Sequence, residues 1–338
     1  MFYLERIEFY ITNVCNYNCD NCNRLNNYNF SGHQKWEDYA EVYKAWHKRI
    51  DFGVISILGG EPLLNPSLPD WLTGLRSLWP NATIQLLTNG SRLKHTPWLY
   101  DAINKNKIEL EISTHNRGTF DKTASEISEI LSKPIQTNLT KNADLWVNEY
   151  NNIKDPSWPE CQTHLDFESL PEWIQDECTN LHKIDPKTFF YNSGTVQLVD
   201  ANQVVVSLNY YEDFVTAPLY YNNDNHFKVY NSDPEQAHKV CISKNCYTFV
   251  RGKLYKCHHV ALLPEFSEQF HVDMTEQDTE LLHAYQPAQS TDTDEELSMF
   301  INNLTHSIPQ CKLCPDKLFP VRVLASNIKP KVLKRQKI

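Results

Sequence analysis

The feature that most constrains this chain is a group of three cysteines near its start. Cys15, Cys19 and Cys22 follow an apolar, strand-like segment and share the loop Cys-Asn-Tyr-Asn-Cys-Asp-Asn-Cys. Three thiolates on so short a loop can hold three corners of a four-iron cubane and leave the fourth iron open to a small molecule. Because an iron with an open position binds and activates its ligand, the loop predicts a reactive metal centre.

A structural zinc site is the main alternative for these cysteines. Such a site takes four tetrahedral ligands, and the nearest fourth candidate, His33, follows at no recognisable finger spacing. The spacing therefore favours the iron cluster. A second motif, Gly59-Gly60-Glu61-Pro62, follows another strand-like segment, and taken alone it would indicate only a tight turn.

Together, the cysteine spacing and the Gly-Gly-Glu-Pro motif resemble the radical S-adenosylmethionine (radical SAM) superfamily. That resemblance implies a SAM-binding [4Fe-4S] cluster on the three cysteines and reductive cleavage of SAM to a 5'-deoxyadenosyl radical. It also implies an electron donor of the flavodoxin or ferredoxin type. One departure is Asn21, because many members of the family carry an aromatic residue just before the third cysteine.

The resemblance further implies SAM contacts at the ends of successive strands. Gly59, Gly60 and Glu61 match the element that receives the methionine ammonium, since glycines allow close approach and a carboxylate accepts from a cation. The other candidates are Thr88, Asn89, Ser113 and Asn138. These four also have a structural interpretation, because Asn-Gly forms turns and Ser or Asn at a strand end caps the next helix. No catalytic acid or base is identified.

Residues 7–140 alternate short apolar strands with amphipathic helical segments, the pattern of a parallel sheet with crossover helices. Strands are expected at 7–12, 54–58, 83–88, 108–113 and 135–139, and helices at 36–50, 68–79, 97–105 and 120–131. A hairpin is expected at 195–199 and 204–208. With the resemblance, this pattern predicts an α/β fold with a partial (β/α)6 radical SAM barrel at residues 1–205.

A second cysteine group lies in the C-terminal part and consists of Cys241, Cys246, Cys257, Cys311 and Cys314. Between the second and third of these, two strand-like runs flank Arg251-Gly252, which predicts a β-hairpin. Cysteines at the two open ends of a hairpin face each other and can bind a metal between them. A zinc ribbon is the alternative, because Cys-x2-Cys pairs also bind zinc.

This group resembles the auxiliary-cluster module called SPASM, or its shortened twitch form. The resemblance implies a smaller α+β domain at residues 206–338 that holds one auxiliary [4Fe-4S] cluster and ends in a basic tail. Five cysteines compete for at most four ligand positions, and one of the irons could instead stay open to substrate. Which cysteines are the ligands is left open by the spacing.

Composition narrows the partners and the compartment. The chain has 338 residues, of which 41% are apolar, and a net charge of −10 that disfavours a nucleic-acid partner. We interpret the basic residues at 329–338 as a solvated terminus. No segment approaches the ~18 to 20 apolar residues of a membrane span, and the start is charged too early for a secretion signal. We therefore expect no membrane partner and a reducing cytoplasmic location for its ten cysteines.

The expected function is that of an oxidoreductase that abstracts hydrogen from a small polar substrate, with the auxiliary cluster as electron acceptor or substrate anchor. We expect no N-terminal peptide-recognition domain, since the predicted barrel starts within a few residues of Met1. The alternatives are a maturase that modifies a peptide or protein, and a non-catalytic iron-sulfur or zinc protein. Glu61 argues against the last, because a sensor needs no carboxylate beside the open iron.

Overall fold

The computed structural model of the chain divides into two compact units, residues 1–85 with 214–338, and residues 86–213. Strand β4 (Thr83–Thr88) crosses the boundary between them. The structure describes residues 1–19, 22–26, 31–114, 122–123, 126–127, 136–137, 193–199, 202–211, 213–214, 219–221, 227–317, 321–322 and 325–326.

The sheet of the first unit has the strand order β13-β12-β1-β3-β4. Strand β1 (Phe2–Tyr10) runs parallel to β3 (Ile50–Leu58), with Ile7 opposite Ile55. On its other side, β1 runs parallel to β12 (Thr248–Val250), with Phe9 opposite Phe249. Residues from the predicted auxiliary domain therefore extend the sheet that the N-terminal strands begin.

The predicted hairpin between Cys246 and Cys257 is confirmed. Strands β12 and β13 (Lys253–Tyr255) are antiparallel, and the turn residues Arg251 and Gly252 have φ angles of 50° and 75°. Two left-handed residues are what a two-residue turn of this kind requires. Trp46 of the helix Trp36–His47 anchors the turn, because its indole nitrogen donates a hydrogen bond of 2.8 Å to the Gly252 carbonyl.

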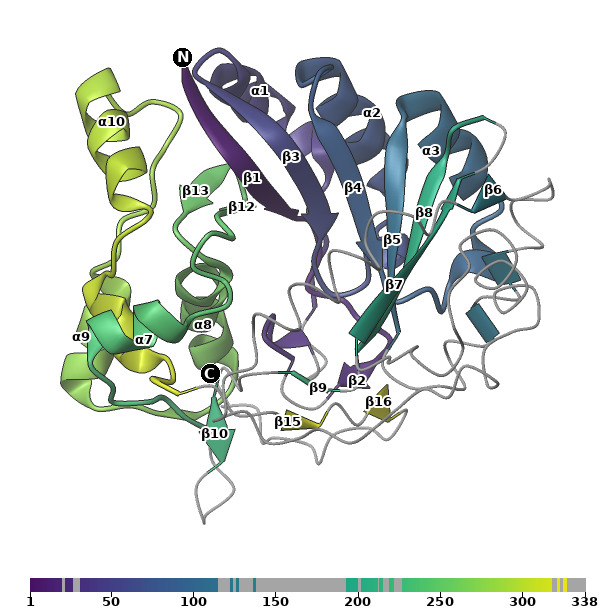
Figure 1. Cartoon of the computed structure of the whole chain (residues 1–338). Coiled ribbons are helices and arrows are strands. Elements are labelled where there is room, and N and C mark those ends of the chain that lie inside the picture. Colours follow the sequence, from purple (N-terminus) through teal and green to yellow (C-terminus); the bar gives the residue numbers. More distant parts are fainter. Residues whose placement is uncertain are drawn as a thin grey trace. The chain divides into compact units, whose positions relative to one another are not determined.

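Helices α1 (Trp36–His47) and α2 (Leu68–Leu78) pack on one face of β1 and β3 (Figure 1). The Phe9 ring lies at the centre of this contact, 5.1 Å from the ring of Tyr43 and 6.4 Å from that of Trp71. Each such buried aromatic side chain stabilises the fold by roughly 1.5 to 3 kcal/mol. Because side chains alternate along a strand, Glu8 and Tyr10 point to the opposite face, and both are also buried.

The C-terminal part of the first unit is mostly helical. Its elements include α7 (Pro234–Val240), α8 (His258–Gln269), α9 (Glu276–His283), α10 (Asp294–Asn303) and the 3-10 helix η5 (Pro309–Leu313). The short strands of the first unit are β2 (Asn18–Cys19) near the N-terminus and, in the C-terminal part, β10 (Tyr220–Tyr221), β11 (Phe227–Lys228), β14 (Val272–Asp273), β15 (Val321–Arg322) and β16 (Ala325–Ser326). Strand β9 (Asp213–Phe214) has one residue in each unit. An apolar cluster around Phe266 of α8 includes Leu25, from the first cysteine loop, and Leu313, next to Cys314. One core thus supports both cysteine groups.

In the second unit, the strand order is β4-β5-β8-β7-β6. Strand β5 (Ile108–Thr114) follows α3 (Leu99–Asn106) and runs parallel to β8 (Val205–Tyr211). Strand β7 (Ser193–Val199) is antiparallel to β8, which confirms the predicted hairpin. The strand expected at 135–139 differs, because β6 (Gln136–Thr137) pairs with β7. The longer β8 ladder fills the place beside β5 instead.

The predicted α/β fold class is confirmed, since parallel strands alternate with helices in the described residues. Division into a core at 1–205 and an auxiliary domain at 206–338 stays a prediction. Most of the helix expected at 120–131 lies outside the described residues. Within the described part of the chain, no helix combines the length and apolar character needed to cross a membrane.

Candidate cluster and cofactor site

The segment after β3 lies directly on the start of the cysteine loop. The Gly60 amide donates to the Thr12 carbonyl at 2.8 Å, and the Glu61 amide donates to the Val14 carbonyl at 2.8 Å. A Cβ atom on Gly60 would lie 2.3 Å from the Val14 oxygen, and one on Gly59 would lie 2.4 Å from the Thr12 oxygen. Only glycine permits this approach, so the two motifs form one backbone unit.

Glu61 is fully buried at this junction. One of its carboxylate oxygens accepts a hydrogen bond of 3.0 Å from the Leu63 amide and caps the short 3-10 helix η2 (Pro62–Leu64). A carboxylate also has lone pairs for further donors, because each oxygen can accept two hydrogen bonds. The geometry therefore gives Glu61 a structural role and places its carboxyl group beside the cysteine loop.

The first two cysteines of the loop have different surroundings. Cys15 is half-buried, and its sulfur accepts a hydrogen bond of 3.4 Å from the Tyr17 amide. Cys19 is buried in β2, which pairs antiparallel with β16 so that Cys19 lies opposite Ala325. Amide donors to sulfur are the contacts that tune a cluster thiolate. The C-terminal segment thus contacts the loop that carries the first cysteine group.

Cys22 lies where the chain turns back on itself. Burial raises the pKa of its thiol, and the backbone amides of Asn26, Arg24 and Leu25 oppose that shift. Leu25 has a φ angle of 60°, and this left-handed residue curls the backbone around the sulfur. These amides favour the thiolate form that binds iron, while burial, the larger effect, favours the thiol.

Among the described residues, no three His, Cys, Asp or Glu side chains form a group close enough to hold one metal ion. This finding concerns a mononuclear site such as zinc, whose ligands converge on a single atom. In a [4Fe-4S] cluster each thiolate binds a different iron, and the sulfur atoms are correspondingly further apart. The role of Cys15, Cys19 and Cys22 as cluster ligands stays a prediction.

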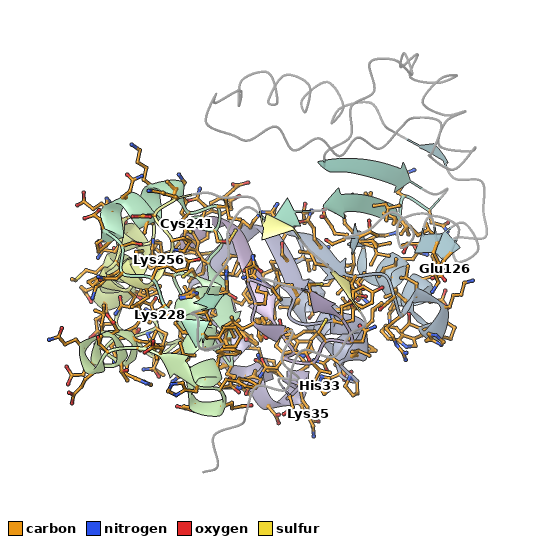
Figure 2. All side chains as sticks on the ribbon, turned by 90° about the horizontal axis from the view of Figure 1, so that it is seen from below. His33, Lys35, Glu126, Lys228, Cys241 and Lys256 are labelled. Atoms are coloured by element: carbon orange, nitrogen blue, oxygen red, sulfur yellow. The ribbon has the colours of Figure 1, made fainter. Side chains whose placement is uncertain are left out.

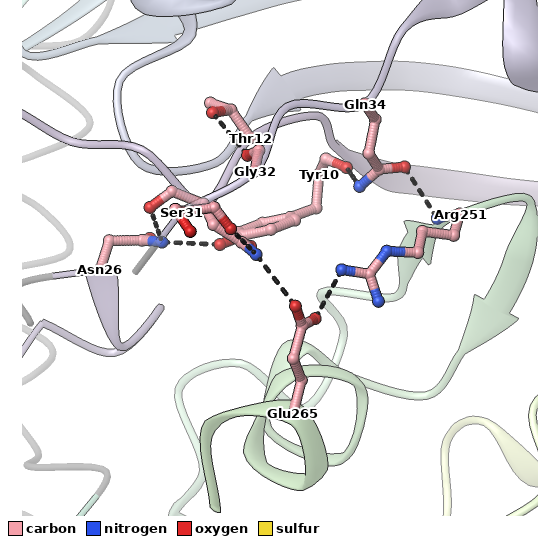
Figure 3. A network of polar contacts seen from close by, with 9 residues as sticks. Tyr10, Thr12, Asn26, Ser31, Gly32, Gln34, Arg251 and Glu265 are labelled. Carbon is pink, nitrogen blue, oxygen red and sulfur yellow. Dashed lines mark hydrogen bonds and ion pairs between the residues drawn. The ribbon is translucent and has the colours of Figure 1, made fainter. Parts of the chain in front are cut away.

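A polar network ties the cysteine loop to α8 and to the hairpin turn (Figure 3). The Asn26 amide donates to the Tyr10 hydroxyl at 2.7 Å and to the Asn13 carbonyl at 2.9 Å. Asn13 in turn donates to Glu265 at 3.4 Å, and Glu265 pairs with Arg251 at 2.6 Å. Both partners of that last pair are partly exposed, so its role is to orient the loop more than to stabilise it.

A second, buried ion pair joins β1 to the loop. Arg24 Nη2 lies 2.7 Å from Glu8 Oε1, while Glu8 Oε2 and Arg24 Nη1 have no hydrogen-bond partner among the described residues. Burial raises the pKa of Glu8, and Arg24 opposes the shift. Cys246 lies beside this pair, since burial and then Glu8 raise the pKa of its thiol to about 11.

Four of the five C-terminal cysteines influence one another. Burial raises the pKa of Cys314 well above its ordinary value, and the other three thiols, those of Cys257, Cys241 and Cys311, add to the rise. Burial likewise raises the pKa of Cys257 to about 11, against the amides at the start of α8. Cys246 exerts no such influence on these two, although Cys241 adds to the rise in the pKa of Cys246. These electrostatic effects indicate that the thiols of Cys241, Cys257, Cys311 and Cys314 lie near enough to act on one another, and their role as ligands stays a prediction.

Local packing explains how these cysteines meet. The Ser232 amide, just before α7, donates to the Lys312 carbonyl in η5 at 2.9 Å. This contact holds the start of α7 against η5, and Cys241 follows at the other end of the helix. The Lys312 ammonium lies 2.8 Å from the Asp278 carboxylate of α9, and this bond anchors the turn from the other side.

Lys256, which no sequence motif singled out, is only 4% exposed. Its ammonium donates to the Leu304 carbonyl and forms no ion pair among the described residues. Burial lowers its pKa, and the thiols of Cys257, Cys311 and Cys241 oppose that shift. Figure 2 labels Lys256 and Cys241. A buried cation is rarely left unpaired, and ionised cysteines around a metal cluster would supply the missing negative charge. The site thus fits an anionic cluster. No local pattern would have revealed Lys256, because it follows the end of β13 and charged residues at such positions are normally exposed.

The remaining SAM candidates belong to the second unit. Thr88 is buried and its hydroxyl accepts from the Gly90 amide at 3.1 Å, while Asn89 accepts from the Ser91 amide at 3.0 Å. These are the turn contacts that the structural interpretation predicts. Ser113 is half-buried in β5, and Asn138 lies outside the described residues. Contacts of all four with SAM stay predictions.

A family model for the radical SAM superfamily matches residues 9–115. The chain carries a radical SAM domain. The matched stretch includes the first cysteine group, the Gly-Gly-Glu-Pro motif and β5. The radical SAM family implies a [4Fe-4S] cluster and SAM as cofactors, and the amide-lined Cys22 and the glycine-opened junction at Gly60 fit that requirement.

Curated relatives match the same N-terminal part. A GTP 3',8-cyclase of Nautilia profundicola is 30% identical over 93 residues, which are 27% of this chain and 29% of that protein. A probable GTP 3',8-cyclase of Saccharolobus islandicus is 28% identical over 119 residues, which are 35% of this chain and 38% of that protein. The chain therefore covers well under half the length of either relative.

Two solved structures are also similar over part of the chain. BtrN in complex with AdoMet and 2-DOIA has a TM-score of 0.26 and 22% identity, covering 35% of this chain and 51% of that one. Streptococcus suis SuiB bound to S-adenosylmethionine has a TM-score of 0.26 and 13% identity, covering 38% and 39%. At these scores the similarity is too low to support a comparison of architecture.

Proposed function

We propose that this chain is a radical SAM enzyme that removes a hydrogen atom from a small polar substrate and uses a second cluster to complete an oxidation. The observation that carries the proposal is the junction of the two motifs. The 2.8 Å bonds from Gly60 to Thr12 and from Glu61 to Val14 fix the Gly-Gly-Glu-Pro element against the backbone that leads into Cys15.

When bound, the first cluster supplies the electron that cleaves SAM to methionine and a 5'-deoxyadenosyl radical, which takes a hydrogen atom from the substrate. Cys15, Cys19 and Cys22 hold three of its irons. Gly60 keeps the backbone open beside the loop, because a side chain there would meet the Val14 carbonyl. The Glu61 carboxylate accepts from the methionine ammonium while it caps η2.

For the auxiliary site we propose Cys241, Cys257, Cys311 and Cys314 as the four ligands. The mutual influence of their thiols and the buried ammonium of Lys256 support this set. Cys246 is then left beside Glu8 and Arg24 as a non-ligand. The cluster would accept the electron left on the substrate radical or anchor the substrate.

Anaerobic reconstitution tests the proposal. Full-length protein should bind about eight irons, the content of two [4Fe-4S] clusters. With SAM and dithionite it should release 5'-deoxyadenosine without substrate, because cleavage belongs to the first cluster. Changing Cys15, Cys19 and Cys22 together to Ala should abolish this product and remove about half of the iron. The matched control is Cys246→Ala, which should still release 5'-deoxyadenosine and should retain its iron.

The outcome also separates the alternatives. A reconstituted protein that holds iron but releases no 5'-deoxyadenosine would favour the non-catalytic iron-sulfur protein. Zinc in place of the C-terminal iron would favour the ribbon. If SAM cleavage is normal, the protein is incubated with small polar compounds and, separately, with peptides. Mass spectrometry of the products then decides between a small-molecule oxidoreductase and a peptide maturase.

A further inference from the structure

Lys256 is a buried lysine that is covalently adjacent to one member of the C-terminal cysteine group. It directly precedes Cys257, it is 4% exposed, and the thiols of Cys241 and Cys311 act on its pKa. Its ammonium has three N–H donors, yet the Leu304 carbonyl is its one hydrogen-bond acceptor among the described residues. The fold therefore keeps a cation where most proteins place an apolar side chain.

A charge in such a place acts strongly on its neighbours. Water screens exposed charges, whereas a buried charge interacts at a lower effective dielectric constant. A [4Fe-4S] cluster with four thiolate ligands is anionic, and one-electron reduction adds one further negative charge. A fixed ammonium beside it therefore stabilises the reduced form more than the oxidised form, and net charge is one of the factors that set a cluster's reduction potential.

We propose that Lys256 is the counter-ion of the auxiliary cluster, which favours the bound cluster and raises its reduction potential so that it accepts an electron more readily. This inference rests on the proposed function, because it requires a cluster on Cys241, Cys257, Cys311 and Cys314. Lys256 is a positioning and tuning residue and not a ligand, since its ammonium has no lone pair to give to iron and the four thiolates bind the four irons.

A matched control is present in the chain. Lys244 carries the same charge and also interacts with Cys241, but its side chain is exposed and its ammonium donates to the Lys239 carbonyl at 3.4 Å. Solvent screens such a charge, so its removal should have a much smaller effect on the cluster. The comparison of Lys256 with Lys244 thus separates burial from the mere presence of a lysine.

The experiment is a redox titration of the full-length chain with the three N-terminal cysteines changed to Ala, so that only the auxiliary cluster contributes. Dithionite supplies the electrons, and electron paramagnetic resonance reports the reduced cluster. Lys256→Met should shift the midpoint potential to a more negative value, and Lys256→Gln, which keeps a donor for Leu304, should do the same. The midpoint potentials of Lys256→Arg and Lys244→Met should stay close to that of the parent protein.

Each outcome has a meaning. The proposal is supported if the midpoint potential becomes more negative in Lys256→Met and Lys256→Gln but stays at the parent value in Lys256→Arg. It is also supported if these two neutral variants lose iron while Lys256→Arg and Lys244→Met keep it. Midpoint potentials that stay at the Lys244→Met value in fully loaded Lys256→Met protein would overturn it. Absence of C-terminal iron from the parent chain would instead remove the proposed auxiliary cluster. Iron content and circular dichroism, measured on every variant, distinguish these cases.

Discussion

Gly60 and Val14 approach each other so closely that a Cβ atom on Gly60 would lie 2.3 Å from the Val14 carbonyl oxygen. The obstacle is backbone, so a side chain at Gly60 can be accommodated only by moving the start of the cysteine loop. We expect Gly60→Ala to lower the free energy of unfolding by roughly 1 to 3 kcal/mol, the usual cost of overpacking. It should also lower the iron bound per folded molecule, as measured after reconstitution.

Gly74→Ala provides the control for general destabilisation. Its Cβ would lie 2.1 Å from Trp36 Cε2, in the contact of α1 with α2 and away from the cysteine loop. We expect reduced stability with a normal iron content per folded molecule. Equal iron content in the Gly60 and Gly74 variants would contradict a specific role of the Gly60 junction.

Glu61 combines a cap and a charge, and two substitutions separate these roles. Glu61→Gln keeps an oxygen that can accept from the Leu63 amide, but it lacks the charge that a methionine ammonium would meet. Loss of a charged hydrogen bond, about 1.5 to 3 kcal/mol, should weaken SAM binding about tenfold or more with little effect on folding. Anaerobic equilibrium binding and urea unfolding measure the two effects.

Glu61→Ala should weaken SAM binding to a similar degree and, in addition, destabilise the fold by about 0.5 to 2 kcal/mol because the cap is lost. A normal SAM dissociation constant in Glu61→Gln would limit Glu61 to its structural role.

Local patterns in the sequence predicted local structure well. The hairpin around Arg251-Gly252 follows from two turn residues that adopt positive φ between strand-like runs, and β4 spans the predicted residues 83–88. Periodicity carries no information about which distant strands pair. The addition of β12 to β1 and the position of β8 beside β5 are therefore visible only in the structure.

The candidate site shows the same division. Spacing singled out both cysteine groups, and their role as metal ligands stays a prediction. Spacing could not separate Cys246 from its four neighbours, since their meeting depends on the packing of α7 against η5. The burial of Glu8, Arg24 and Lys256 could not be predicted from the sequence either, because charged residues are normally exposed.

The proposed auxiliary ligand set gives a prediction about two neighbouring cysteines. Cys241→Ala should remove about half of the reconstituted iron, because it takes a ligand from the four-cysteine group. Cys246→Ala should retain the iron, since Cys246 lies beside Glu8 and Arg24 instead. Iron and sulfide assays on the two variants make the comparison. The reverse result would place Cys246 among the ligands and exclude Cys241.

Two buried histidines follow Cys257 at the start of α8, and they predict how stability depends on pH. Burial lowers the pKa of His259 to about 4 and that of His258 well below its ordinary value. Neither His258 Nδ1 nor His259 Nε2 has a hydrogen-bond partner among the described residues. Both rings are therefore held neutral in the folded chain while they titrate freely in the unfolded one.

The sign follows from this difference. Below the unfolded pKa of about 6.5, the unfolded chain binds protons that the folded chain does not, so stability is complete above that pH and is lost as the pH falls towards 4. Each histidine contributes up to about 1.4 kcal/mol per pH unit in that window. Urea unfolding of the protein between about pH 6.5 and about pH 5.5 should show the loss. His259→Phe should reduce the slope because it removes one titrating group and fills a similar volume, and an unchanged slope would contradict the neutral, buried state of His259.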